Sequence, residues 1–182
     1  MARLAAVTLV LVFSGLESQG QGPPSLAPYV PTPPDVVDRM LRLARTGPGD
    51  VVYDLGCGDG RIVIAAARLG ARGVGVDIDP NLIARAESNA RSAGVQDRVR
   101  FRVQDAMTVD LSDATVVTLY LLAASNVKLR PILTTQLARG SRIVAHNYPI
   151  GDWEPEVIDN FTDAAGVRRT LYLWTVGGGA KN

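Results

Sequence analysis

The sequence has few of the residues that build disulfides, metal centres and hydrolytic triads. Its 182 residues include one cysteine and one histidine. The single cysteine, Cys57, excludes an internal disulfide and any metal site made of several cysteines, and we predict no bound metal. A hydrolytic triad would have to use His146, the only histidine, and the sequence offers no nucleophile elbow to serve it.

The chain also has little excess charge and no long apolar run. It contains 19 Lys and Arg against 18 Asp and Glu, which gives a formal net charge of +1 at pH 7. Because the sequence shows no basic stripe, phosphate-driven binding has no electrostatic support, and we predict no nucleic-acid partner. The N-terminal apolar stretch, residues 4–16, is shorter than the roughly 20 residues that span a bilayer.

Composition divides the chain into three segments. Residues 1–20 carry a positive charge at Arg3, then the apolar stretch, then small residues at signal-peptidase spacing, which is typical of a secretory signal peptide; an uncleaved membrane anchor is the alternative. Residues 21–31 are rich in Gly and Pro and are predicted to be a linker. Residues 32–182 are long enough for one domain with its own core.

From residue 32 onward, apolar segments of strand length alternate with helical segments. We expect Thr32 to be the N-cap of the first helix and Pro131 to lie in the first turn of a later one. Residues 107–113 are too few for a usual crossover helix, so a loop or a single turn is expected there, and no helix is evident between the fifth and sixth strands. The alternation predicts an α/β fold with a single doubly wound, mostly parallel, Rossmann-like sheet. The expected strands are residues 51–55, 73–77, 99–103, 114–119, 142–145, 155–161 and 170–176.

A glycine-rich turn follows the first predicted strand and precedes a helical segment. It reads D-L-G-C-G-D-G from Asp54 to Gly60, with glycine at every second position. Glycines at Gly56, Gly58 and Gly60 let the backbone bend sharply and approach a ligand without a Cβ in the way. The spacing G-x-G-x-G differs from the dinucleotide pattern G-x-G-x-x-G. Cys57 is interpreted as a small residue that fills the turn.

Acidic residues also end the next two predicted strands. Asp77 lies 23 residues after Asp54, at the end of the second strand. A carboxylate at this place in a βαβ unit can accept hydrogen bonds from ribose hydroxyls. Asp105 follows the third strand after Gln104. Three strand ends with these residues in register favour a nucleoside-containing cofactor over a plain α/β turn.

These three strand ends resemble the cofactor motifs of the class I methyltransferases that use S-adenosyl-L-methionine (SAM). The resemblance implies that SAM is the cofactor and that the last strand of the sheet is antiparallel. It implies that Asp54 pairs, directly or through water, with the amino group of the methionine part, and that Asp77 binds the ribose. It also implies that Asp105 binds the adenine amino group and that the three glycines admit the backbone to the cofactor.

A narrower resemblance extends over about residues 29–176. The chain is similar to small bacterial relatives of the mitochondrial lysine methyltransferases. Those enzymes act on the c subunit of ATP synthase and on the adenine nucleotide translocase. This implies a protein-lysine N-methyltransferase whose acceptor is on a membrane protein. The residues themselves leave open a small-molecule N-, O- or S-methyltransferase, or a SAM-binding protein without turnover. The segments that carry the resemblance are residues 29–33, 59–63, 116–122, 129–131 and 151–155.

The acceptor side of such a site is predicted beyond the fourth and fifth strands. Open α/β sheets place their ligands outside the carboxyl ends of strands, which puts Tyr120 and His146 near the acceptor. A lysine amine must be neutral to attack, so it needs a base or an apolar pocket. His146 has the pKa class of a base, although a lone histidine is more often structural. Tyr120 and His146 are therefore our candidate catalytic residues, and Tyr29 is a candidate cover for the methionine end.

The N-terminal segment and the cofactor point to different cellular locations. The signal-like residues 1–20 predict an exported, periplasmic or membrane-anchored protein. SAM is made in the cytosol, so a cytoplasmic location is the alternative.

Overall fold

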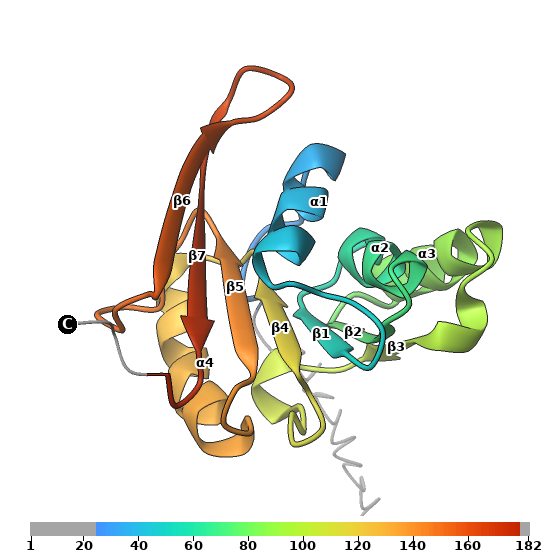
Figure 1. The fold of residues 1–182 in the computed structure, drawn as a ribbon. Helices are drawn as coiled ribbons and strands as arrows, with labels where there is room; N and C mark the ends of the chain where they lie inside the picture. Colours follow the sequence, from blue (N-terminus) through green and yellow to red (C-terminus); the bar gives the residue numbers. More distant parts are fainter. Residues whose placement is uncertain (1–24, 179–182) are drawn as a thin grey trace, which may run out of the picture.

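The computed structural model describes residues 25–178; the predictions for residues 1–20, and the first part of the predicted linker, lie outside this range. Seven strands form one sheet in the order β3-β2-β1-β4-β5-β7-β6 (Figure 1). Strands β1 to β5 are parallel, and β7 is antiparallel to both β5 and β6. The predicted doubly wound, mostly parallel sheet with an antiparallel last strand is confirmed. The strands are β1 (Val51–Leu55), β2 (Arg72–Asp77), β3 (Val99–Val103), β4 (Val116–Leu119), β5 (Arg142–His146), β6 (Val157–Thr162) and β7 (Arg168–Thr175).

Helices cover both faces of the sheet. Helices α1 and α2 pack on one face, where Val37 and Met40 lie against strand residues such as Val144. Helix α4 packs on the opposite face through Leu129 and Leu133. The strands between these layers are buried on both sides, which explains their near-continuous apolar sequence. The helices are α1 (Pro34–Leu43), α2 (Arg61–Arg68), α3 (Pro80–Ser92) and α4 (Ala123–Gln136), with short 3₁₀ turns η1 (Gln96–Arg98) and η2 (Ala106–Thr108).

The connection from β3 to β4 is unusually short. It contains only η2, which confirms the predicted loop or single turn. In a doubly wound sheet a crossover helix would normally cover the sheet here. The α4 side of β2 and β3 carries exposed arginines instead, at Arg72, Arg100 and Arg102. The link between β5 and β6, residues 147–156, also contains no helix, as the sequence predicts.

Two helix boundaries differ from the sequence predictions. Thr32 is not the N-cap of α1: Pro33 occupies that position, and no side chain caps the helix. Pro131 is not in the first turn of α4, because the helix begins eight residues earlier, at Ala123. A proline inside a helix leaves the carbonyl four residues before it without its usual donor. That residue is Val127, which lies on the solvent-exposed side of α4 and is 48% exposed.

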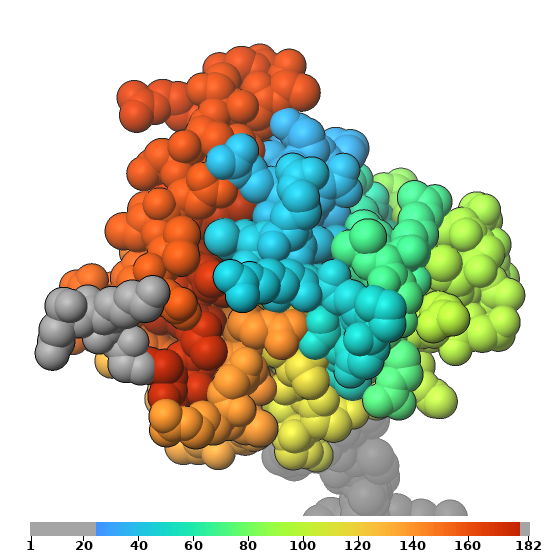
Figure 2. All heavy atoms as spheres, viewed as in Figure 1, coloured from blue at the N-terminus to red at the C-terminus, as the bar shows by residue number. Residues whose placement is uncertain are grey.

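The β6–β7 hairpin extends past the end of β5 and stands beside α1 (Figures 1 and 2). Arg39 of α1 forms an ion pair with Asp159 of β6 at 2.6 Å. The backbone N–H of Ala164, at the hairpin tip, donates to the Asp35 carboxylate at 2.7 Å. These contacts fix the hairpin against the first helix.

Within residues 25–178, no helix combines the length and the apolar character that crossing a membrane requires.

Candidate functional site

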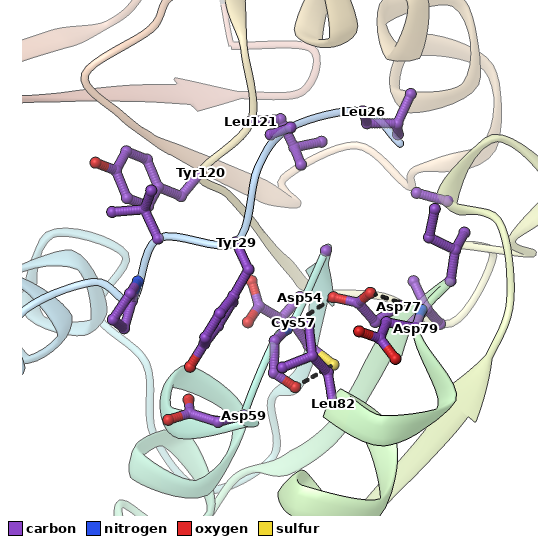
Figure 3. A pocket seen from close by; sticks show the side chains of 18 of the residues that line it. Leu26, Tyr29, Asp54, Cys57, Asp59, Asp77, Asp79, Leu82, Tyr120 and Leu121 are labelled. Carbon is purple, nitrogen blue, oxygen red and sulfur yellow. Dashed lines mark hydrogen bonds between the residues drawn. The ribbon is translucent and has the colours of Figure 1, made fainter. Parts of the chain in front are cut away.

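A cavity of about 310 Å³ lies at the carboxyl ends of β1, β2 and β4 (Figure 3). Its wall includes residues 25–32, which we call the N-terminal strap, the glycine turn at residues 56–59, and residues 77–79 after β2. The volume is at the lower end of the range for small-molecule sites. Its position, at the carboxyl ends of parallel strands, is where open α/β sheets bind their ligands. Its other wall residues are Asp54, Arg61, Ile62, Val76, Leu82, Gln104, Ala106, Tyr120 and Leu121.

Asp54 lies at the bottom of this cavity, at the end of β1. Asp54 is only 3% exposed, and its carboxylate accepts a hydrogen bond from the Thr118 hydroxyl at 2.8 Å. Burial raises the pKa of the Asp54 carboxyl to about 7, the Thr118 hydrogen bond opposes this, and the nearby charges of Asp77 and Asp59 raise it further. A cation placed beside Asp54 would favour its ionised form.

The glycine turn passes close to groups that leave no room for a side chain. A Cβ on Gly58 would lie 2.5 Å from the ring of Tyr29, and one on Gly56 would lie 2.8 Å from Leu121. Both glycines have positive φ, at 54° and 83°. Between them, Cys57 is buried, and burial raises the pKa of its thiol. The turn therefore places bare backbone at the cavity wall, as the sequence predicts for a close ligand contact.

Asp77 links the glycine turn to the start of α3. One carboxylate oxygen accepts the backbone N–H of Gly58 at 2.9 Å, and the other accepts that of Asp79 at 3.0 Å. Asp79 in turn caps α3 by accepting from Asn81 N at 2.8 Å. Asp77 and Asp79 both line the cavity (Figure 3). The ribose contact of Asp77 stays a prediction.

The structure brings Asp54, Gly56, Gly58 and Asp77 together at the cavity but leaves two of the predicted cofactor-binding residues, Gly60 and Asp105, outside its wall. A Cβ on Gly60 would lie 2.7–2.8 Å from Phe101 and Ala86, so this glycine allows the turn to pack against the sheet and α3. Asp105 caps η2 by accepting from Met107 N at 2.9 Å. Its neighbours Gln104 and Ala106 line the cavity. The adenine contact of Asp105 stays a prediction.

The N-terminal strap lies across the cavity, although most of it falls in the segment that composition predicts to be a linker. The Arg61 guanidinium donates to the Thr32 carbonyl at 2.8 Å and pairs with the Asp59 carboxylate at 2.6 Å. Burial acts to raise the pKa of Asp59, but the bonds from Arg61 outweigh it and hold the pKa below its usual value. The Tyr29 hydroxyl points toward the same carboxylate (Figure 3). At the other end, the Ser125 hydroxyl donates to the Leu26 carbonyl at 2.6 Å.

Tyr120 and His146 lie together, with Tyr120 in the cavity wall and His146 behind it. Their rings stack with centroids 3.9 Å apart. His146 is fully buried, and neither ring nitrogen has a hydrogen-bond partner among residues 25–178. Burial, with a smaller effect from Arg169, lowers the pKa of His146 to about 4, so the imidazole is neutral at pH 7 and takes up a proton weakly. Both catalytic roles stay predictions.

Similar proteins are methyltransferases. Residues 54–157 match the family described as ANTKMT methyltransferase domain. A Saccharolobus islandicus protein named protein-lysine N-methyltransferase is 42% identical over 152 residues, which cover 82% of this chain and 94% of that protein. The mouse adenine nucleotide translocase lysine N-methyltransferase is 35% identical over 72% of this chain and 57% of its own length, so this chain spans little more than half of it.

Solved structures of similar proteins contain the product form of the cofactor. A Salinibacter ruber protein described as an RNA methyltransferase, in complex with S-adenosyl-L-homocysteine, is 55% identical with a TM-score of 0.76, covering 81% of this chain and 94% of that chain. A SAM-dependent methyltransferase from Geobacter sulfurreducens, with the same molecule, is 30% identical with a TM-score of 0.56, covering 63% of this chain and 48% of that chain.

The cavity described above fits SAM. The cofactor carries a cationic amine and a cationic sulfonium, and the wall offers the carboxylates of Asp54 and Asp77. Gly56 and Gly58 place backbone without a side chain in the cavity wall, so the backbone can approach the cofactor closely. With the match over more than half of its length and these structural relatives, the chain belongs to the ANTKMT methyltransferase domain family and is a SAM-dependent methyltransferase.

Proposed function

We propose that this enzyme transfers the methyl group of SAM to the side-chain amine of a lysine in a protein. The observation that carries the proposal is the 42% identity to the Saccharolobus islandicus protein-lysine N-methyltransferase over 94% of that protein. The likeness to the mouse adenine nucleotide translocase lysine N-methyltransferase supports it, although this chain covers only 57% of that enzyme.

The charge of the cavity wall suits a cationic donor and an amine acceptor. Four carboxylates line the wall, from Asp54, Asp59, Asp77 and Asp79. Among residues 25–178, the guanidinium of Arg61 is the one cationic side chain in the wall, and it is already paired with Asp59 at 2.6 Å. A cleft with one sign of charge concentrates ions of the opposite sign. Both the sulfonium and the lysine side chain are cations in solution, so the wall attracts both reactants.

The chain's own residues have to align the two reactants and exclude water. Bound SAM supplies the electrophilic methyl group, and the displacement is in line, so alignment is the main contribution of the protein. The glycine turn and Asp77 hold the donor side. Tyr120 lies on the side of the cavity away from Asp77, and Tyr29 lies between Tyr120 and the glycine turn (Figure 3), where the two rings would flank the amine. Their rings exclude water, which disfavours the charged ammonium and favours the neutral, nucleophilic amine.

Methyl-labelled SAM tests the proposal directly. The enzyme is incubated with the labelled cofactor and with membrane and soluble extracts, and labelled proteins are analysed by mass spectrometry. We expect methylated lysine, and less label with the variant Gly58→Ala when the SAM concentration is below saturation. Label only in low-molecular-weight material would indicate a small-molecule methyltransferase. Bound SAM with no transfer to any fraction would indicate a binding protein without turnover, and either result contradicts the proposal.

RNA is a second candidate substrate. The 55% identity to the Salinibacter ruber protein described as an RNA methyltransferase favours it. The carboxylate-rich cavity disfavours it, because backbone phosphates would approach a wall in which acidic side chains outnumber the basic one. The same incubation therefore includes RNA, followed by digestion to nucleosides. Methyl label in nucleosides and none in protein would replace lysine by RNA as the substrate.

We also propose that the acceptor is a membrane protein and that residues 1–20 export the enzyme or anchor it to the membrane. The apolar residues 4–16 and the likeness to the mouse translocase methyltransferase support this. Fractionation of the native host, with the mass of the mature protein, tests it. Cleavage near residue 20 indicates export, and full mass in the membrane fraction indicates an anchor. Full-length protein in the cytoplasmic fraction would contradict both.

A further inference from the structure

The end strand β3 has backbone hydrogen-bonding groups that nothing in the sheet uses. Gln104 N donates to Asp77 O at 2.9 Å, so Arg100 and Arg102, which alternate with it, also direct their backbone N–H and C=O groups toward β2. The backbone N–H and C=O groups of Phe101 and Val103 point the other way, out of the sheet edge. No hydrogen bond within residues 25–178 joins this outer edge to another element. Val103 is also 57% exposed, so the edge is open to solvent.

The same edge carries a row of arginines. Arg100 and Arg102 are exposed and stand two residues apart in β3, which in a strand is a spacing of roughly 6.6 Å, and the exposed Arg98 lies just before the strand, at the end of η1. Arg72 of β2 lies on the same side as Arg100 and Arg102, where the short β3–β4 connection leaves no covering helix. None of these four side chains has an ion-pair partner in the described part of the chain.

Open grooves run along both sides of this edge. One, of about 450 Å³, lies between α3 and β3 and has Glu87, Arg91 and Arg100 in its wall. The other, of about 200 Å³, lies on the α4 side and includes Asp113. Glu87 pairs with Arg91 at 4.0 Å, whereas Asp97 and Asp113 in the wall of the second groove have no ion pair among the described residues. The four arginines also line this second groove and outnumber these two carboxylates, so the net unpaired charge along the edge is positive.

We propose that the outer edge of β3 docks an extended, acidic segment of the protein acceptor. The segment adds to the sheet as a further strand and places carboxylates at alternate positions beside Arg100 and Arg102. Opposite charges across neighbouring strands stabilise such pairing, whereas a second copy of this edge would be repelled by its own arginines. The proposal rests on the proposed function, because it takes the partner to be a protein.

The free backbone groups favour a peptide over other anionic partners. RNA or an acidic membrane would use the arginines alone, whereas a peptide strand also bonds the outward groups of Phe101 and Val103. The chain runs from Val103 directly to Gln104, which lines the cofactor cavity. A segment held on β3 therefore lies beside the Gln104 side of the cofactor cavity, with β2 and β1 between it and β4, which Tyr120 follows.

The test measures peptide binding to the full chain saturated with S-adenosyl-L-homocysteine. The probe is a fluorescent peptide of about ten residues with alternating Thr and Glu and no lysine; the control peptide has Gln in place of Glu. We expect only the Glu peptide to bind, more weakly at high salt. The variant R100E/R102E should weaken binding by on the order of tenfold or more, and R100K/R102K should retain most of it. The variant R42E/R139E changes the net charge equally at exposed arginines elsewhere and should bind normally.

Amide exchange distinguishes strand addition from simple attraction. Binding of the Glu peptide should slow exchange at the Phe101 and Val103 amides of the unaltered chain. Equal binding of both peptides, or unchanged exchange at these amides, overturns the proposal. So does binding of an RNA oligonucleotide or of vesicles with acidic phospholipid, lost in R100E/R102E, when the peptide does not bind. If R100E/R102E fails to fold, the exchange measurement still decides. The probe contains no lysine, so failure here leaves the proposed lysine methylation standing, and failure of lysine labelling leaves the peptide result unchanged.

Discussion

At the scale of single residues, Asp54 keeps a carboxyl group out of water in a cavity that receives a cation. Its pKa, raised to about 7 by burial, lies well above the roughly 3.9 of an unfolded chain. Between these two values the folded state holds a proton that the unfolded state has lost. Buried carboxyl groups with raised pKa are common where a ligand later supplies the compensating charge.

This difference predicts how stability depends on pH in the absence of cofactor. Because the folded state binds more protons, the free energy of unfolding should fall as pH rises from about 4 to about 7, and this contribution should then level off. Urea unfolding across this range tests it, with Asp54→Asn as the control that cannot ionise. We expect the unaltered protein to lose stability relative to the variant as pH rises. Parallel curves for the two proteins would mean that the pKa of Asp54 is the same in the folded and unfolded states.

Gly58→Ala should weaken SAM binding by on the order of tenfold, through backbone strain of about 1–2 kcal/mol at positive φ and through displacement of Tyr29. Gly94→Ala is the matched control, since Gly94 also has positive φ, at 69°, but nothing lies within 4 Å of its Cβ position. Calorimetry with SAM should show normal affinity for Gly94→Ala. Equal losses in both variants would assign the effect to strain alone.

Tyr120→Ala should lower turnover more than SAM affinity. Tyr120 lies in the cavity wall, stacked on His146, and its loss would disturb the acceptor side by removing a ring that orients it. A misplaced acceptor costs on the order of tenfold or more in kcat. Tyr120→Phe keeps the ring and its stacking and should retain most of the turnover. A large rise in the SAM dissociation constant with unchanged kcat would move Tyr120 to the donor side.

At the scale of elements, the N-terminal strap depends on one guanidinium. Arg61→Ala removes the donor to the Thr32 carbonyl and leaves Asp59, whose side chain is 13% exposed, without its ion pair. Hydrogen bonds to charged groups contribute about 1.5–3 kcal/mol, so SAM affinity should fall about tenfold as the strap loosens. Arg68→Ala, an exposed arginine on the same helix, is the control and should bind SAM normally. If Arg61→Ala also binds normally, the strap does not contribute to cofactor binding.

Some elements can be predicted from local sequence and others cannot. The alternating apolar segments and the D-L-G-C-G-D-G turn predict the parallel strands and the cofactor turn, because strand period and glycine spacing are local properties. The predicted start of α4 was wrong because Leu122, its N-cap, makes no side-chain cap bond, so the proline was the stronger signal. The strap has the composition of a linker because its order comes from distant residues such as Ser125, 99 positions away from Leu26.

The candidate site divides in the same way. Asp54, Gly56, Gly58 and Asp77 could be predicted because each follows directly from a strand end. The buried position of His146 could not, since it depends on α1 and β7 packing around the end of β5. The antiparallel direction of β7 could be predicted only from the family resemblance, because a strand's own residues do not determine its direction in the sheet.

At the scale of the whole molecule, the fold and the cofactor cavity should be separable. The fully buried apolar residues begin at Val36, and the strap adds only the partly buried Leu26 and Ala27 to this core, whereas the cavity wall includes residues 25–32. A chain shortened to begin at residue 25 should therefore fold and bind SAM normally. One that begins at residue 33 should still fold but bind SAM on the order of tenfold more weakly. Circular dichroism and calorimetry measure the two properties separately, and loss of folding in the second chain would show that the strap is part of the core.

The buried thiol of Cys57 allows the cofactor turn to report its own opening. Only a thiolate reacts readily with alkylating reagents, and burial both shields this thiol and raises its pKa. The chain contains no other cysteine, so each alkylated molecule has exposed this turn at least once. The alkylation rate thus measures how often the centre of the site unfolds locally. The measurement needs no engineered probe, and a ligand that closes the turn will lower the rate.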